Sequence, residues 1–254
     1  MPGRAHKPSL FPRRKFVMTN LFSTVRQASP NDFRYEKLCK AIGILGIAYP
    51  FVNLLYDLLY SAYNGLPLEM RPTVSCYFWA PGTVWFVGVL WIFGIILLYY
   101  SRDKKEGVTT TLAGICAFSI AAFAQEASEC GPGLAPSSEL YSTIHYLSAV
   151  SFFLLLTYLS FLFTRKTPQQ QQVSLATNRK NTKDKRNRIY IWCGSIMALC
   201  LLLAFLYHYF HVDLGSGRFY QPTFWLETIM LIAFGVSWLT RSHSFRLLQK
   251  PENE

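Results

Sequence analysis

The sequence predicts an all-α membrane protein, a polytopic transmembrane bundle of six helices with both termini in the cytoplasm. Three observations support this fold class. Apolar residues make up 51% of the 254-residue chain and aromatic residues 16%, whereas only 15% are charged, against about 25% in soluble domains. The apolar residues form six runs of roughly the 20 residues that a membrane-spanning helix needs. Almost all Lys and Arg residues fall in tails and connections that would lie on one face of the membrane, as the positive-inside rule requires.

The predicted spans differ in quality. They are residues 41–60, 83–100, 108–127, 141–164, 189–210 and 222–240. The fourth is the cleanest, since it holds no charge except a possible one at His145, and the first is the weakest, because it contains Pro50, Asn53 and Asp57. A membrane helix tolerates such residues where a neighbouring helix satisfies their polar groups. An interfacial or re-entrant segment is the alternative for the first span.

The basic residues predict the sidedness of the chain. Of the 25 Lys and Arg residues, all but Arg71 and Arg218 fall in the two tails or in the second and fourth connections. This pattern predicts a basic cytoplasmic N-terminal tail over residues 1–40, a cytoplasmic linker over 165–188 and a cytoplasmic C-terminal tail over 241–254. The net charge of +11 therefore indicates contact with anionic lipids on the cytoplasmic face. It does not indicate nucleic-acid binding, because the sequence has no folded basic module.

The N-terminal tail leaves two alternatives open. It has no apolar run of the signal-peptide type and no acidic residue before Asp32, so a transit peptide is a second interpretation. Met18 is an alternative start, in which case residues 1–17 are not translated.

Polar residues within the spans are expected to gather near the outer face. Odd spans run outward and even spans run inward, so positions that are distant in the sequence reach the same depth. Ionisable groups in a membrane are costly and are candidates for function. The predicted ligand or proton pocket contains Asn53, Asp57, Glu126, Tyr141, His145, Ser148 and Glu227. The alternative is that these residues make structural hydrogen bonds between helices.

Three histidines and one glutamate are the sharpest candidates. Zinc takes His and carboxylate ligands and leaves one position to water, so His145, His208 and His211 form a candidate zinc site. Such an ion would activate water for hydrolysis. Glu227 lies in an apolar run, where a carboxylate must be protonated or paired, and His145 and His208 are its expected partners by depth. No cofactor is certain, since the sequence has no Walker, GxSxG or Gly-rich phosphate motif.

The cysteines and glycines predict contacts between segments. Cys76 and Cys130 are the two cysteines expected outside, and in an oxidising compartment they would form a disulfide; two free buried thiols are the alternative. Small residues in membrane helices allow close packing. The glycines expected at such contacts are Gly43, Gly46, Gly88, Gly94, Gly114, Gly194 and Gly235.

Four short stretches resemble a known family. They are Phe86-Val87-Gly88 with Leu97-Leu98-Tyr99-Tyr100, then Leu112-Ala113-Gly114, then His145 with Ser148-Ala149 and Phe152-Phe153, and lastly Phe224-Trp225-Leu226-Glu227 with Ala233 to Thr240. Over about residues 75–241 the chain resembles uncharacterised bacterial six-span membrane proteins similar to the domain of unknown function 998 family. The resemblance implies a multi-pass protein of the bacterial inner membrane and supplies no activity. The Arg-Asp pair expected before Phe86 is absent, since Ala80 to Trp85 stand there.

A looser resemblance points to alkaline-ceramidase-like membrane hydrolases. His145, His208 and His211, with Asp57 and Ser75, are similar to the zinc site of those proteins, although six spans replace seven and the histidine spacing differs. The leading interpretation is a binding or transport-like module, without demonstrable catalysis, for a lipid, a small polar ligand or a proton. The alternatives are a zinc-dependent hydrolase of lipid amides or esters and a structural subunit of a membrane complex.

Overall fold

The computed structural model describes residues 30–100, 104–131, 133–134, 138–164, 180–210 and 219–242. The described part of the chain is helical and contains no β-strand beyond an isolated bridge at Tyr220. Its α-helices are α1 (Pro30–Tyr63), α2 (Thr83–Tyr99), α3 (Lys104–Ala122), α4 (Glu139–Leu162), α6 (Lys180–Tyr209) and α7 (Pro222–Arg241). Two short 3₁₀-helices, η1 (Ser75–Trp79) and η2 (Ala127–Glu129), lie in the connections after α1 and α3.

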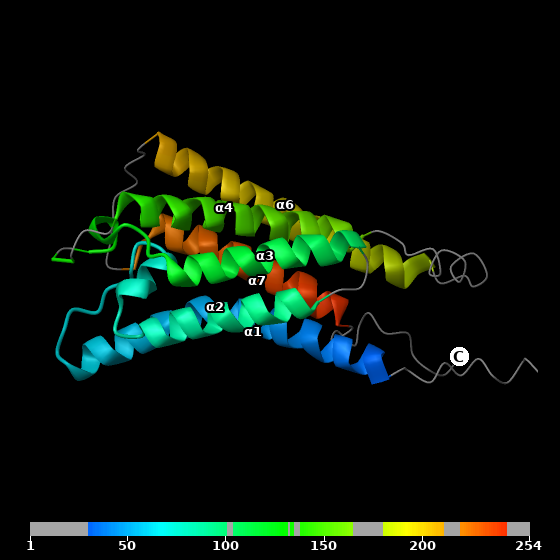
Figure 1. The fold of residues 1–254 in the computed structure, drawn as a ribbon, viewed down its shortest axis with the longest axis horizontal. Helices are drawn as coiled ribbons and strands as arrows, with labels where there is room; N and C mark the ends of the chain where they lie inside the picture. Colours follow the sequence, from blue (N-terminus) through cyan, green and yellow to red (C-terminus); the bar gives the residue numbers. More distant parts are fainter. Residues whose placement is uncertain are drawn as a thin grey trace, which may run out of the picture.

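The helices form an elongated bundle and run alternately between its two ends (Figure 1). Pro30 at the start of α1 and Arg241 at the end of α7 lie at the same end of this bundle. We call this the inner end, and we call the end with η1 and η2 the outer end. These names refer to the two ends of the bundle and do not assign either end to a side of the membrane.

Four helices are long and apolar enough to cross a membrane. Their spans are Tyr35–Tyr63, Glu139–Leu162, Lys185–Tyr209 and Pro222–Arg241. α2 is apolar but has 17 residues, at the lower limit for a span, and α3 begins with Lys104, Lys105 and Glu106. The chain is therefore a helical, multi-pass membrane protein by the length and composition of its helices.

Three helix boundaries differ by five residues or more from the sequence prediction, and the others by at most four. α1 begins at Pro30, inside the segment predicted as a tail, and α6 begins at Lys180, inside the predicted linker. Polar residues can continue a helix beyond the hydrocarbon, because its backbone hydrogen bonds do not depend on the lipid. α3 ends at Ala122 rather than at residue 127, so Glu126 lies in the connection and not on the third helix.

Glycine contacts hold the bundle closely packed. A Cβ on Gly235 would lie 2.6 Å from the carbonyl oxygen of Gly43, and a Cβ on Gly114 would lie 2.9 Å from that of Gly94. These pairs let α1 approach α7 and α2 approach α3 at backbone distance, as small residues do between membrane helices. Gly46 and Gly194 also face neighbouring aromatic rings, but Gly88 has no atom within 4 Å of such a Cβ. The close-contact prediction is thus wrong for Gly88.

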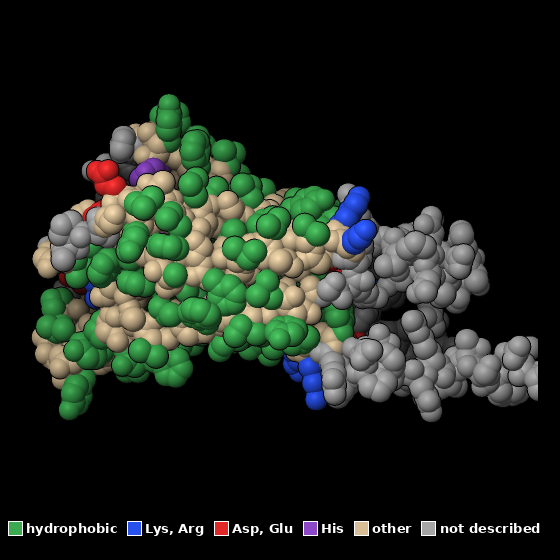
Figure 2. All heavy atoms as spheres, viewed as in Figure 1, with side chains coloured by type: hydrophobic (Ala, Val, Ile, Leu, Met, Phe, Trp, Pro, Cys, Tyr) green, Lys and Arg blue, Asp and Glu red, His purple; other side chains and the backbone are tan. Residues whose placement is uncertain are grey.

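Charge is divided between the two ends of the bundle. On the face in Figure 2, the most prominent Lys and Arg side chains lie at the inner end, the most prominent acidic and His side chains at the outer end, and hydrophobic side chains between them. Among the described residues, Arg71 is the one Lys or Arg at the outer end. This distribution follows the charge asymmetry of the sequence.

Candidate functional site

The segment between α1 and α2 covers the outer end of the bundle. Its 3₁₀-helix η1 is joined to the connection after α3 by the Cys76–Cys130 disulfide, whose Cα atoms are 5.1 Å apart. The Thr73 hydroxyl donates to Gln125 Oε1 at 2.8 Å, and the Trp79 indole donates to the Gln125 carbonyl at 3.0 Å. We call residues 72–79 the outer cap. The outer cap therefore belongs to the connection between α1 and α2 and is fixed to the connection after α3.

Glu227 joins the outer cap to α7. The backbone N–H of Val74 donates to Glu227 Oε2 at 2.6 Å, and the Ser75 N–H also lies against this carboxylate. Close by, the Phe224 N–H donates to the Pro72 carbonyl at 3.1 Å. Backbone amides are strong partners for a carboxylate, because charge-assisted hydrogen bonds are about twice as strong as neutral ones. The expected partners His145 and His208 do not take this role.

Glu227 also faces a cavity in the middle of the bundle. This cavity has a volume of about 30 Å³ and is lined by Tyr49, Val74, Ser75, Phe86, Leu90, Phe93, Ile120, Ala149, Phe152, Phe153, Glu227 and Leu231. Most of its wall is apolar, with Glu227 as its one carboxyl side chain. The volume suits one or two water molecules and is far below the 300–1,000 Å³ of a site for a drug-sized ligand.

The other residues predicted for the pocket do not line this cavity. Asn53 and Asp57 lie on the buried face of α1, where the Asn53 amide donates to the Tyr49 carbonyl at 2.9 Å. Arg71 Nε is 3.1 Å from Asp57 Oδ2, an ion pair between α1 and the loop that follows it. Tyr77 of η1 is close to this pair, and burial, followed by the nearby Asp57 charge, raises the pKa of its hydroxyl.

A second group of predicted residues gathers between α3 and α4. His145 Nδ1 is 2.7 Å from the Phe123 carbonyl. Ser142 donates to Glu126 Oε2 at 3.1 Å, and Ser148 donates to Ser119 at 2.8 Å. Tyr141 is half exposed and packs its ring on Phe123, with 5.3 Å between centroids. The structure thus divides the predicted pocket into an α1–α7 group and an α3–α4 group, because these residues face different neighbours around the bundle.

The predicted zinc ligands are not brought together by the described residues. His145 is buried, whereas His208 is exposed and packs on Tyr146 with 6.5 Å between ring centroids. His211 lies outside the described residues. Within the part of the chain that the structure describes, no group of three His, Cys, Asp or Glu side chains is placed to hold a metal ion.

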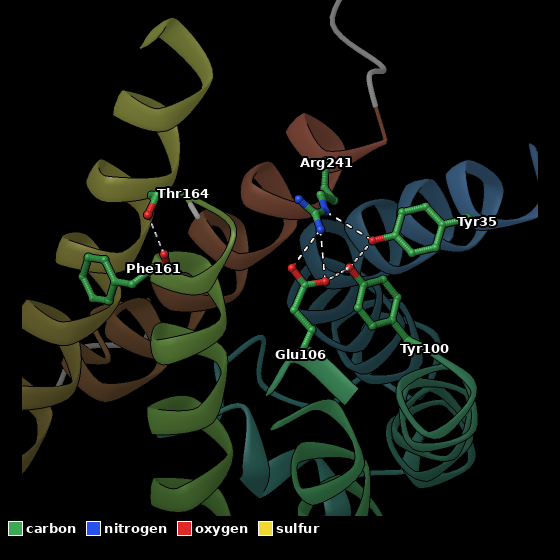
Figure 3. A network of polar contacts seen from close by, with 6 residues as sticks. All are labelled: Tyr35, Tyr100, Glu106, Phe161, Thr164 and Arg241. Atoms are coloured by element: carbon green, nitrogen blue, oxygen red, sulfur yellow. Dashed lines mark hydrogen bonds and ion pairs between the residues drawn. The ribbon is translucent and has the colours of Figure 1, made fainter. Parts of the chain in front are cut away.

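An ion pair at the inner end was not expected from the sequence. Arg241 Nη2 lies 2.8 Å and 3.0 Å from the two carboxylate oxygens of Glu106, and Arg241 Nε donates to the Tyr35 hydroxyl at 3.2 Å. The Tyr100 hydroxyl donates to Glu106 and also contacts that of Tyr35 (Figure 3). The Arg241 guanidinium stands 4.7 Å from the Phe163 ring centroid. This inner network therefore joins α1, α3, α7 and the ends of α2 and α4.

An apolar groove separates the outer halves of α6 and α7. It has a volume of about 430 Å³ and is lined by Leu203, Leu206, Tyr207, Phe210, Pro222, Trp225, Leu226 and Ile229. Its walls lie on the opposite side of α7 from Glu227, since Leu226 and Ile229 face the groove and Glu227 faces the central cavity. These lining residues include no acidic or basic side chain.

Comparison of the chain with family models, with curated proteins and with solved structures found no match.

Proposed function

We propose that the chain is a six-pass membrane protein and that it acts as a non-catalytic binding or transport-like module, with Glu227 as its proton- or ligand-binding group. The observation that carries the proposal is the position of Glu227, inside the bundle, on the wall of an otherwise apolar cavity and under the outer cap. An ionisable group within a membrane bundle is costly to bury and is retained where it has a role.

The alternating course of the helices supports six passages. Four helices reach spanning length, and α2 and α3 run between the same two ends as these four (Figure 1). A bundle with Pro30 and Arg241 at one end crosses the membrane an even number of times. The basic inner end is then cytoplasmic under the positive-inside rule, in a membrane of the bacterial inner-membrane type, and membership of the six-span family of unknown function 998 is part of this proposal.

The cavity volume limits the ligand of Glu227. A space of about 30 Å³ accepts a proton, a water molecule or a small ion, and a lipid chain does not fit there. Neither the hydrolase nor the subunit alternative gains a specific supporting contact from the described residues. A proton or small ion bound to Glu227 is therefore the form of the proposal that the geometry favours.

A hydrophobic carbodiimide tests the role of Glu227. Such reagents modify protonated carboxyl groups in apolar surroundings, so we expect membranes containing the protein to be labelled at Glu227 and labelling to fall as the pH rises. Peptide mass spectrometry locates the label, and Glu227→Gln should remove it. Exposed Glu139 is the internal control, because it lies outside apolar surroundings. Labelling of Glu139 but not of Glu227 would overturn the proposal.

A further inference from the structure

Several buried oxygen atoms at the outer end have no hydrogen-bond partner. Among the described side chains, these are Asn53 Oδ1, Asp57 Oδ1, the Tyr77 hydroxyl and the Thr228 hydroxyl. All four residues are at most 3% exposed. A buried polar atom without a partner costs about 1–3 kcal/mol, and four of them at one end of a small bundle require an explanation.

The helix register brings these atoms to one place. α1 and α7 are antiparallel, and Gly46 and Gly235 mark a level at which they touch, since a Cβ on Gly46 would lie 3.5 Å from Gly235 Cα. Seven residues outward from these positions, two helical turns on each helix, stand Asn53 and Thr228. Helical periodicity thus assigns both positions to the facing sides of α1 and α7, about two turns outward from the glycine contact.

One further turn outward completes the group. Asp57 follows Asn53 on the same face of α1, and the corresponding position on α7 is Phe224. The Tyr77 ring packs on Phe224 with 6.0 Å between centroids, and the Asp57 charge acts on the Tyr77 hydroxyl. The four oxygen atoms thus belong to one region, bounded by α1, η1 and α7.

The unpaired atoms have the chemistry of a cation site. The Asn53 amide nitrogen is engaged by the Tyr49 carbonyl, so its Oδ1 atom is left as an acceptor, and Asp57 Oδ1 is likewise an acceptor only. The two hydroxyls offer lone pairs as well. A set of oxygen atoms without nitrogen or sulfur suits a hard cation. Ca²⁺ prefers six to eight oxygen ligands with several carboxylates, so a singly charged ion fits this set better.

Near this region, an ionised Glu227 would lack a positively charged partner. Arg71, the one Lys or Arg described at the outer end, lies 3.1 Å from Asp57, while Glu69, Glu126, Glu129 and Glu139 are further acidic residues at that end. Arg71 pairs with Asp57, and Glu227, which precedes Thr228, is held by uncharged amides. A proton on Glu227 or a cation beside Thr228 would each compensate the charge of Glu227.

We propose that Asn53, Asp57, Tyr77 and Thr228 bind a monovalent metal cation of the size of Na⁺ between α1, η1 and α7. The cation and the proton on Glu227 are then alternatives for the same missing charge. This second statement rests on the proposed function of Glu227, whereas the cation site itself does not.

Thermal unfolding of the purified protein in detergent tests the site. We expect the melting temperature to rise in a saturable manner with NaCl and not with choline chloride at equal ionic strength, because a ligand of the folded state stabilises it. Thr228→Val keeps the side-chain shape and removes one ligand, so it should raise the NaCl concentration of half-effect about tenfold. Asn53→Asp adds a carboxylate and should lower that concentration.

A matched control separates ligand loss from general effects. Thr157 on α4 also has a buried hydroxyl without a partner, but it lies near the inner end. Thr157→Val should leave the NaCl dependence unchanged. Equal melting temperatures in the two salts would overturn the cation site, as would an unchanged NaCl dependence in Thr228→Val; both results would indicate buried water instead.

Carbodiimide labelling distinguishes the two proposals. NaCl should slow the labelling of Glu227 if the cation and the proton compete. Labelling that ignores NaCl, with no NaCl-dependent melting, would overturn the cation site and leave the role of Glu227 intact. If Glu227 is not labelled but melting still depends on NaCl, the role of Glu227 would be overturned and the cation site would stand.

Discussion

Glu227 receives its hydrogen bond from main-chain amides of the outer cap, and not from a side chain. The interaction therefore depends on where residues 73–76 are held, which the disulfide at Cys76 and the hydroxyl of Thr73 help to fix. The carboxylate has two roles. It satisfies a donor of the outer cap and it gives the central cavity its polar wall.

Two replacements of Glu227 should differ in stability. Glu227→Leu leaves the Val74 N–H without an acceptor, so we expect a loss of about 1–3 kcal/mol in the free energy of unfolding. Glu227→Gln keeps an oxygen acceptor and should lose less. Denaturant unfolding in detergent measures both, with Glu69→Leu at an exposed loop position as the control, expected within about 0.5 kcal/mol. A fully stable Glu227→Leu protein would show that this hydrogen bond contributes nothing.

The helices are joined at their ends by different kinds of interaction. At the outer end, the outer cap uses a disulfide and backbone hydrogen bonds. At the inner end, Arg241 and Glu106 form an ion pair between α7 and α3, and their side chains are 12% and 9% exposed. Between the two ends, packing is mainly apolar, and a few hydrogen bonds join the helices there, such as Ser160–Ser237 between α4 and α7 and Ser148–Ser119 between α4 and α3.

Breaking the inner ion pair should be strongly destabilising. Arg241→Ala leaves the Glu106 carboxylate buried without its charged partner, so we expect a loss of about 3–5 kcal/mol in the free energy of unfolding. The double replacement Arg241→Met with Glu106→Leu removes both charges and should be less harmful than either single change. A double-mutant cycle measures the coupling. Additive effects would show that the two side chains do not interact.

The whole molecule is organised by the alternation of its helices between two ends of opposite charge. Hydropathy and the placement of Lys and Arg are properties of the sequence, so the helical class and the membrane character could be predicted from them. The partners could not. Arg71 pairs with Asp57 across a loop, and Arg241, predicted as the first residue of the cytoplasmic C-terminal tail, is buried against Glu106.

The misjudged contacts share a physical cause. The sequence identifies Glu227 as a group that needs a partner, but a backbone amide carries no residue type by which to recognise it. The same holds for His145, whose ring contacts the Phe123 carbonyl. The depth of a residue along its helix could be estimated from the span boundaries. The direction in which it faces could not, because packing fixes the rotation of each helix about its axis. The predicted pocket residues therefore face two different places.

Sidedness is testable on intact cells. Glu139→Cys at the outer end and Lys185→Cys at the inner end are both exposed positions. An impermeant maleimide should label the first in intact cells and the second only after permeabilisation, with the unsubstituted protein as the control for its free cysteines. Labelling of both positions in intact cells would contradict the even number of passages.

The Cys76–Cys130 bond closes a ring of chain that contains α2 and α3. A protease that cuts after exposed Lys104 or Lys105 would therefore open this ring without separating its pieces. On a non-reducing gel the nicked protein would migrate as one species, and a thiol reductant would release two fragments. The backbone between α2 and α3 is thus dispensable for keeping the two parts of the polypeptide covalently united.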